Sequence, residues 1–281
     1  MRIVRTPAEL TEWTETAHGQ GRRVGLVPTM GFLHEGHLSL MAASRERADV
    51  TAVSIFVNPT QFGPTEDLAR YPRDLEGDLE KCRAAQVDAV FAPEVGAMYP
   101  SGHRTFVEVT GLQDRLCGAH RPGHFRGVAT VVTQLFALAR PHLAVFGEKD
   151  WQQLQVIRRL ASDLHLGVDV VGMPIVREVD GLAMSSRNAY LTPPERTRAL
   201  ALSRGLQAAR SRWASGERGS EALRDAVRAE LRAGEVREDY VELVTPDSLE
   251  DLHRADRADA RLLVAGVVGR TRLIDNTAIG C

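Results

Sequence analysis

Five apolar runs alternate with helix-like segments between residues 24 and 176, and this alternation limits the possible folds more than any other feature. The runs are RVGLVP, VTAVSIFV, VDAVFAP, LAVFG and VDVVGMPIV. Most are continuously apolar, as expected for strands that are covered on both faces of a parallel sheet. Helices are expected between them over residues 36–48, 74–86, 126–139 and 151–164. The pattern predicts an α/β fold with a Rossmann-like, doubly wound parallel sheet.

The texture of the chain changes after residue 176. A polar stretch, REVDGLAMSSRNAYLTPPER, leads into two charged amphipathic helices expected over 194–215 and 220–233. The runs DYVELVTP, RLLVAGVVG and TRLIDNTAI then read as strands. We therefore predict two domains, a Rossmann-like domain over residues 1–175 and a smaller C-terminal α+β domain over residues 176–281.

Composition excludes several classes of protein. The formal net charge of -2 argues against a general nucleic-acid binder, which normally carries a basic patch. The charged start, MRIVRTPAELTEW, lacks the apolar core of a signal peptide, and no apolar stretch is long enough to cross a bilayer. Cys82, Cys117 and Cys281 are far apart and form no CxxC, so neither a disulfide framework nor a four-cysteine zinc site is expected. These features predict a cytoplasmic protein that binds neither nucleic acid nor membrane.

The stretch VPTMGFLHEGHLSLM joins the first apolar run to the first helix through a glycine turn. In open α/β sheets a ligand lies beyond the carboxyl ends of the strands, where N–H groups at a helix start attract anions. His34 and His37 fall there, and imidazole can donate hydrogen bonds to phosphate oxygens. Ordinary helix capping is an equally supported alternative. Zinc binding is less favoured, because the spacing is HExH and lacks the i, i+4 pair of HExxH.

A second polar stretch follows the next apolar run. In FVNPTQFGPTEDLARYPRDLEGDLEKC, Asn58 and Gln61 come directly after the strand, where amides can orient a small polar substrate. A simple Asn-Pro turn is the alternative. One carboxylate of the following acidic helix can hold Mg²⁺, although most of that acidic run is expected to be a solvated face.

Three more segments place phosphate-compatible groups at strand ends or at the domain junction. They are VFGEKDWQQLQVIRRL with Lys149, Asp150 and Gln153, DGLAMSSRNAYL with Ser185, Ser186 and Arg187, and RPGHFRGVATVV with Arg121, His124 and Arg126. A lysine can neutralise charge on a transferring phosphoryl group, and hydroxyl and guanidinium groups bind phosphate oxygens well. Each segment alone also fits an exposed loop. Their convergence on one kind of ligand is the stronger argument.

Taken in order, six segments resemble those of the pantothenate synthetases (pantoate–β-alanine ligases), a family of the HxGH nucleotidyltransferase superfamily. The segments are PTMGFLHEGHLSL, SIFVNPTQFG, YPRDLEGDLEKC, GHFRGVATVV, FGEKDWQQL and VREVDGLAMSSRNAYL. The resemblance implies an ATP-dependent ligation in two steps. Pantoate attacks the α-phosphorus of ATP to give pantoyl adenylate and pyrophosphate, and the amine of β-alanine then releases AMP and leaves pantothenate.

The resemblance also implies roles for individual residues. Residues 34–37 match the HxGH signature, and residues 184–187, beginning at Met184, resemble the counterpart of the KMSKS loop of class I aminoacyl-tRNA synthetases. The catalytic contacts to ATP phosphates would come from His34, His37, Lys149, Ser186 and Arg187. The nucleotide would be framed by Pro28, Thr29, Met30, Gly36, Gly147, Asp150 and Val176, with Met184 and Ser185 of the loop beside it. Pantoate would bind Met30, Asn58, Gln61 and Gln153, and Asp78 best matches the acidic position associated with Mg²⁺.

The sequence departs from the family pattern at two nearby positions. Phe32 stands where a small residue, often Ala, is usual, and is expected to stiffen or crowd the turn; Asp74 replaces a common Thr. The resemblance further implies a homodimer. A reactive adenylate needs shielding from water, so we hypothesise that the C-terminal domain acts as a lid.

Two other functions are compatible with parts of the pattern. An adenylyltransferase of the same superfamily would stop after nucleotidyl transfer and would not depend on an amine. A non-catalytic nucleotide-binding protein would bind ATP without releasing pyrophosphate. A tRNA-charging role is disfavoured by the balanced charge and by the lack of an anticodon-binding extension.

Overall fold

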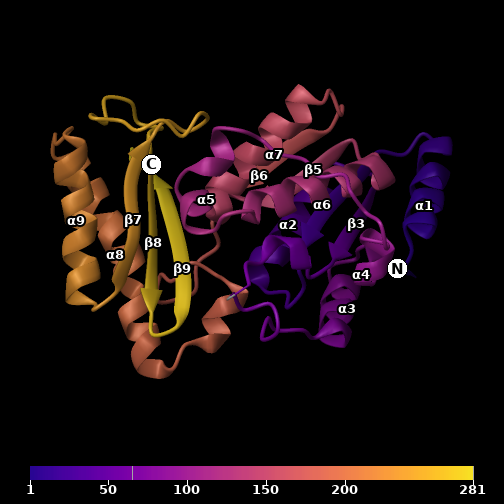
Figure 1. The fold of residues 1–281 in the computed structure, drawn as a ribbon, viewed down its shortest axis with the longest axis horizontal. Coiled ribbons are helices and arrows are strands. Elements are labelled where there is room, and N and C mark those ends of the chain that lie inside the picture. The colour runs from indigo at the N-terminus through magenta and orange to yellow at the C-terminus, as the bar shows by residue number, and fades with distance from the viewer. Residues whose placement is uncertain (65, 281) are drawn as a thin grey trace. The chain divides into compact units, whose positions relative to one another are not determined.

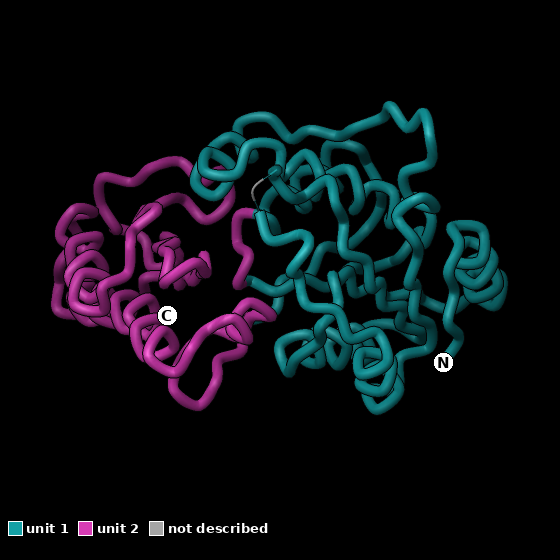
Figure 2. Tube along the Cα trace, turned by 60° about the horizontal axis from the view of Figure 1, so that its bottom comes forward, with its two compact units in different colours: residues 1–148, 153–174 teal, residues 149–152, 175–281 magenta. Residues whose placement is uncertain are grey.

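A computed structural model describes residues 1–64 and 66–280, which form two compact units (Figure 2). Unit 1 consists of residues 1–148 and 153–174, and unit 2 consists of residues 149–152 and the described part of 175–281. The predicted boundary lay between residues 175 and 176, one residue later than the observed division. The short segment 149–152 was assigned to the first domain by the prediction but belongs to unit 2. The lid role remains a prediction.

Unit 1 is built on a six-stranded sheet in which all strand pairs are parallel, in the order β1-β4-β3-β2-β5-β6. Three of these strands, β3, β5 and β6, are labelled in Figure 1. The strands are β1 (Arg2–Val4), β2 (Val24–Thr29), β3 (Val50–Ile55), β4 (Ala89–Phe91), β5 (Leu143–Gly147) and β6 (Asp169–Met173). The predicted parallel α/β fold is confirmed. Because β2 lies between β3 and β5, the segments that follow these three strands meet at one edge of the sheet.

Helices cover both faces of this sheet. They are α1 (Pro7–Gly19), α2 (Glu35–Arg45), α3 (Leu75–Ala84), α4 (Val95–Met98), α5 (Cys117–His120), α6 (His124–Ala139) and α7 (Trp151–Asp163). Met41 of α2 packs with Val27 of β2 on one face, and Ala17 of α1 packs with Val24 of the same strand. Residues 24 and 27 point to opposite faces because side chains alternate along a strand. The sheet is therefore wound on both sides, as predicted.

The first strand and first helix were not predicted from the sequence. A three-residue edge strand is too short to show periodicity. The start of α1 does carry a signal, because Thr6 and Glu9 form a capping box around Pro7 at the first helical position. The side chain of Thr6 accepts the Glu9 N–H at 3.2 Å, and the Glu9 carboxylate accepts the Thr6 N–H at 3.0 Å.

Unit 2 is the predicted small α+β unit. Helices α8 (Pro193–Ala214) and α9 (Ser220–Ala233) precede a three-stranded antiparallel sheet of β7 (Arg237–Val244), β8 (Arg261–Val268) and β9 (Thr271–Ala278), with β8 in the centre. Its core contains a cluster in which Leu202 and Leu223 of the helices pack with Val264 of β8. Helix α8 begins at Pro193, as its proline pair predicts, and Thr192 caps it by accepting the Glu195 N–H.

Two observations on the described residues bear on membrane spans and on the cysteines. No helix among them is long and apolar enough to span a membrane. Cys82 and Cys117 are buried, and burial raises the pKa of the Cys82 thiol to about 12, which keeps it protonated at neutral pH. Cys281 lies outside the described residues.

Candidate functional site

The turn that follows β2 has an unusual backbone. Gly31 has φ of 81° and Phe32 has φ of 50°, so two consecutive residues lie in the left-handed region. A Cβ on Gly31 would stand 2.9 Å from Oδ2 of Asp78, which leaves room only for glycine. Phe32 adopts a conformation that costs a bulky residue of order 1–3 kcal/mol, so surrounding bonds must hold it. The sequence analysis expects Phe32 to stiffen or crowd the turn, and its φ value shows that the backbone is strained at this residue.

The bonds that hold this turn come from α3. One carboxylate oxygen of Asp78 accepts the Phe32 N–H at 2.8 Å, and the other accepts the Leu33 N–H at 2.7 Å. Lys81, one turn further along the helix, donates from Nζ to the carbonyl of Leu33 at 2.8 Å. On the strand side, Thr29 Oγ1 accepts the Gly31 N–H at 3.2 Å. Hydrogen bonds from α3 thus fix the main chain directly before His34.

Asp78 therefore fits a structural anchor better than a metal ligand. The residue is 1% exposed and both of its oxygens accept backbone N–H groups. Burial raises the pKa of its carboxyl group, and the bonds from Leu33 and Phe32 oppose that rise. Among the described residues, no group of three or more His, Cys, Asp or Glu side chains is arranged to hold a metal ion. The predicted Mg²⁺ role of Asp78 is untested, and this geometry does not favour it.

The two histidines of the HxGH stretch stand together at the start of α2. His34 is the residue that precedes the first helical position, and its ring centroid lies 4.1 Å from that of His37. The N–H of His34 donates to Nδ1 of His37 at 3.2 Å. Since Nδ1 accepts a hydrogen bond, the ring hydrogen of a neutral His37 lies on Nε2, which becomes a donor. Capping and phosphate binding are thus compatible, because the cap uses Nδ1 and the donor is Nε2.

Asn58 organises the turn after β3. It caps the short 3₁₀ helix η1 (Pro59–Gln61), where its Oδ1 accepts from the N–H of Thr60 at 3.3 Å and from its hydroxyl at 2.9 Å. Its Nδ2 donates to the carbonyl of Gly127 in α6 at 3.1 Å. A Cβ on Gly127 would stand 2.3 Å from the Thr60 carbonyl oxygen, so glycine permits this close approach. The Asn58 amide is occupied within the protein, in keeping with the Asn-Pro turn alternative.

Gln61, at the end of that turn, is held by its main chain. Its carbonyl accepts from Nδ1 of His124 at 2.8 Å and from Arg121 at 3.2 Å. Arg121 also forms an ion pair with Glu66, with Nε donating at 3.0 Å. The sequence marked Arg121 and His124 as possible phosphate ligands. In the structure both contact the Gln61 carbonyl, and their binding of phosphate stays a prediction.

In unit 2, the segment that carries Lys149 is held from the C-terminal sheet. The buried Asn276 of β9 donates from Nδ2 to the Lys149 carbonyl at 2.9 Å, and its Oδ1 accepts from Nε of Arg261 at 2.7 Å. The Arg261 guanidinium lies 3.6 Å from the ring centroid of Trp151. Trp151 Nε1 donates to the carbonyl of Pro246 at 2.8 Å. These contacts place residues 149–152 in unit 2, although they follow β5 in the chain.

The loop of residues 185–187, which we name the SSR loop, begins a short 3₁₀ helix η4 (Ser186–Tyr190) in unit 2. Ser185 Oγ accepts the Arg187 N–H at 3.3 Å, and Ser186 is buried. A turn closed by an antiparallel bridge between Arg177 and Ala183 precedes the loop.

That turn is tied to β9 through a buried carboxylate. The guanidinium of Arg177 forms two hydrogen bonds to Asp275, at 2.7 and 3.0 Å. The carboxylate of Asp275 is almost completely buried, and a paired, bidentate contact of this kind is both directional and strong.

The predicted site residues divide between the two units. Those in unit 1 are Pro28, Thr29, Met30, His34, Gly36, His37, Asn58, Gln61, Asp78, Gly147 and Gln153. Those in unit 2 are Lys149, Asp150, Val176, Met184, Ser185, Ser186 and Arg187. Within unit 1, the turns after β2 and β3 and the end of β5 share one edge of the sheet, as predicted.

The sequence analysis missed the residues that hold the site from a distance, among them Asn276 and Arg261. The available signal was the polar pair Asp275 and Asn276 inside the apolar run of β9, where both side chains are buried. A buried polar side chain requires a partner, but its identity depends on the folded structure.

Comparison with known proteins agrees with this architecture. A family model described as Pantoate-beta-alanine ligase matches residues 2–278. A pantothenate synthetase of Myxococcus xanthus is 63% identical over 280 residues, which cover 99% of this chain and 96% of that protein. A crystal structure of pantothenate synthetase from Thermus thermophilus has 48% identity and a TM-score of 0.94, with 99% of each chain covered. The crystal structure of pantoate-beta-alanine ligase from Francisella tularensis, complexed with beta-gamma ATP and beta-alanine, has 30% identity and a TM-score of 0.84, covering 100% of this chain and 98% of that one.

Proposed function

The chain belongs to the pantoate–β-alanine ligase family, and from this premise we propose how its residues carry out the reaction. The enzyme condenses pantoate with β-alanine at the expense of ATP and forms pantothenate, AMP and pyrophosphate through pantoyl adenylate. The observation that carries the assignment is the family match over residues 2–278, in a chain that keeps each of the six motif segments.

In the first step, the pantoate carboxylate attacks the α-phosphorus of ATP and pyrophosphate leaves. The carboxylate is already ionised at neutral pH, so this attack needs no general base. Alignment and neutralisation of developing negative charge supply most of the rate enhancement in such a step. Hydrogen-bond donors and cations near the phosphates are therefore the groups that matter.

We propose that His34 and His37 of unit 1 contact these phosphates. The support for His37 is its Nδ1, which accepts the His34 N–H and leaves the ring hydrogen on Nε2. The support for the turn as a whole is its anchoring by Asp78 and Lys81, which fixes the main chain immediately before the histidines. A donor that is already in place costs no reorganisation when charge develops.

From unit 2, Lys149, Ser186 and Arg187 complete the catalytic contacts to the phosphates in this proposal. Lysine supplies a compact positive charge, and arginine a planar fork of donors that suits phosphate oxygens. The nucleotide is framed by Pro28, Thr29, Met30, Gly36, Gly147, Asp150, Val176, Met184 and Ser185. Pantoate binds Met30, Gln61 and Gln153, and Asn58 supports the turn that presents Gln61.

Three further properties belong to the proposal. Mg²⁺ would bind mainly to the triphosphate of ATP, because this ion usually takes few ligands from the protein. Neither the geometry of Asp78 nor any step above requires this residue to bind the ion. A homodimer is proposed from the family resemblance, and analytical ultracentrifugation tests it. A cytoplasmic location is supported by the sparse, unpaired spacing of the cysteines in the sequence.

The assay that tests the function measures AMP and pyrophosphate release with ATP and pantoate, with and without β-alanine. The ligase should release both products continuously only when β-alanine is present, and pantothenate should accumulate in equal amount. An adenylyltransferase would release pyrophosphate with one acceptor and ignore the amine. ATP binding without pyrophosphate release would instead identify a non-catalytic nucleotide-binding protein.

A further inference from the structure

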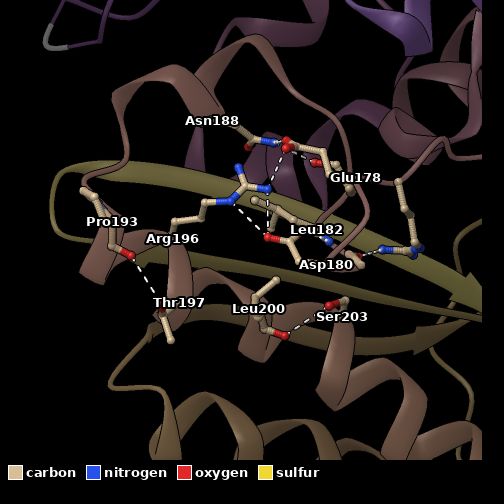
Figure 3. Close-up of polar contacts among 12 residues, drawn as sticks. Glu178, Asp180, Leu182, Asn188, Pro193, Arg196, Thr197, Leu200 and Ser203 are labelled. Carbon is tan, nitrogen blue, oxygen red and sulfur yellow. Dashed lines mark hydrogen bonds and ion pairs between the residues drawn. The ribbon is translucent and has the colours of Figure 1, made fainter.

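Glu178 lies in the turn between Arg177 and Ala183, and its carboxylate joins two elements that follow it in the chain (Figure 3). Oε1 accepts a hydrogen bond from Nδ2 of Asn188 at 2.7 Å, and Oε2 accepts one from Arg196 at 2.6 Å. Asn188 follows Arg187 directly, and Arg196 lies in the first turn of α8. One side chain therefore connects the turn, the SSR loop and the start of a long helix.

The Asn188 side of this link is tied to the SSR loop by short chain length. The Asn188 amide donates a second hydrogen bond, to the carbonyl of Ala183 at 3.1 Å. The Asn188 N–H also donates to the Ser185 carbonyl at 2.9 Å. Because residues 185–188 form one tight turn, a shift of Asn188 must move Ser186 and Arg187.

The Arg196 side of the link is tied to the core of unit 2. Helix α8 buries Leu202 and Leu206 against the sheet, so the guanidinium extends from a well-packed element. Arg196 also contacts Asp180, with Nε and Nη2 donating to Oδ2 at 3.0 and 2.8 Å. Glu178 and Asp180 thus share Arg196, but of these two carboxylates only Glu178 contacts Asn188 in the bonds drawn in Figure 3.

We propose that Glu178 is a positioning residue for ATP-dependent adenylation, which fixes the SSR loop by joining Asn188 to Arg196. The inference rests on the proposed function, in which Ser186 and Arg187 contact the phosphates of ATP. Glu178 itself touches no substrate in this proposal. It transmits the position of α8 to the loop through two charge-assisted hydrogen bonds.

The decisive variant is Glu178→Gln, which keeps the size of the side chain but cannot accept hydrogen bonds at both ends. We expect kcat/KM for ATP to fall by about 10- to 100-fold, as for a misplacement of about 1 Å at a reacting group. The KM for β-alanine should stay within about twofold, because the loss concerns the adenylation step. The matched control is Asp180→Asn, which removes the negative charge of the other partner of Arg196 and leaves the Glu178–Asn188 hydrogen bond in place. It should keep kcat/KM for ATP within about threefold of the parent enzyme.

A double-mutant cycle with Arg187→Ala separates positioning from general stability. If Glu178 acts through the loop, Glu178→Gln should lower kcat/KM for ATP by less than about threefold when Arg187 is already absent. An equal loss in both backgrounds would overturn the proposal. So would an equal loss in Asp180→Asn, because the effect would then belong to the whole ion network.

The same cycle distinguishes failure of this inference from failure of the proposed function. Near-normal turnover of Arg187→Ala would overturn the role of the loop and the inference with it. A strong loss in Arg187→Ala beside normal activity in Glu178→Gln would overturn only the inference. If Glu178→Gln does not fold, Asn188→Ala provides the test, because it breaks the same link and leaves Arg196 paired; normal activity in that variant would also overturn the inference.

Discussion

The two loops proposed to contact ATP phosphates are held in different ways. The turn of residues 31–37 in unit 1 is fixed through its main chain, by a carboxylate that is 1% exposed. The SSR loop in unit 2 is fixed mainly through side chains, and the Glu178 and Arg196 side chains are 26% and 33% exposed. The first arrangement protects its hydrogen bonds from water, and the second leaves them partly solvated.

This difference indicates how much each anchor should matter. Removing one partner from a buried hydrogen bond leaves a desolvated group unsatisfied and costs about 1–3 kcal/mol, whereas exposed ion pairs contribute about 0–1 kcal/mol. The turn of residues 31–37 is also strained at Phe32, so it depends on its anchor. We therefore expect substitutions that remove the anchor of that turn to affect both stability and turnover, and substitutions that remove the anchor of the SSR loop to affect mainly turnover.

The largest expected effect comes from Lys149, because its side chain is proposed to contact the phosphates of ATP directly. Lys149→Ala should lower kcat by ~10²–10³-fold, as is typical when a group that stabilises the transition state is lost. The KM for pantoate should change little, and steady-state kinetics with varied pantoate measures both. Lys149→Arg keeps the charge and should recover part of the rate. Near-normal turnover of Lys149→Ala would remove Lys149 from the mechanism.

Asp78→Asn tests the main-chain anchor. The amide can accept only one of the two N–H groups, so we expect kcat to fall by about 10²-fold and unfolding free energy to fall by about 1–3 kcal/mol. Activity assays and urea denaturation measure the two effects. Asp74→Asn is the matched control, because Asn caps the start of α3 as well as Asp does. If excess Mg²⁺ restored the rate of Asp78→Asn and its stability were normal, Asp78 would be a metal ligand instead.

Asn276→Ala tests whether the segment that carries Lys149 is held by a buried anchor, as the turn of residues 31–37 is, or by a partly exposed one, as the SSR loop is. The buried amide holds the Lys149 carbonyl, so its loss should reduce kcat by about 10-fold through displacement of the lysine. It should also lower Tm, because Arg261 loses the acceptor for its Nε. Thr277→Ala on the same strand is the control, since its hydroxyl donates to the neighbouring Ala278 carbonyl. A lowered Tm with full turnover would give Asn276 a purely structural role.

The smallest effect concerns the opposite end of β2, where His142 Nδ1 accepts the Val24 N–H at 3.0 Å. Burial, with His18 and Arg23 nearby, lowers the pKa of His142 below its ordinary value of 6.5. Its stabilisation is therefore complete above pH 6.5 and is lost as the pH falls through the lowered pKa. Unfolding free energies near pH 7.5 and pH 5.5 should differ by less than about 1 kcal/mol from this group, because its ring is only partly buried. His142→Asn keeps an acceptor and should flatten that difference; an unchanged pH dependence would assign it to other groups.

Much of unit 1 could be predicted because its signals are local. Continuous apolar runs predicted β2, β3 and β5. The glycine turn after β2 predicted that His34 and His37 lie at the start of a helix. The anchors could not be predicted, because they join residues far apart in the chain. Asp78 bonds to Phe32 across 46 residues and Asn276 to Lys149 across 127, so both depend on how elements register in the folded units. The sequence also left open whether the histidines cap the helix or bind phosphate. The reason is that one ring, that of His37, carries both a capping nitrogen, Nδ1, and a potential donor, Nε2.

ATP–pyrophosphate exchange in the presence of pantoate and in the absence of β-alanine, measured for His37→Asn, tests the central claim most directly. Asparagine keeps an acceptor near the position of Nδ1 and can cap the His34 N–H, but it has no donor at the position of Nε2. The account predicts an unchanged Tm and exchange reduced by ~10²–10³-fold, with a smaller loss for His37→Gln, whose amide nitrogen reaches farther. Exchange near the parent rate in His37→Asn would show that the histidine only caps the helix and would contradict the account.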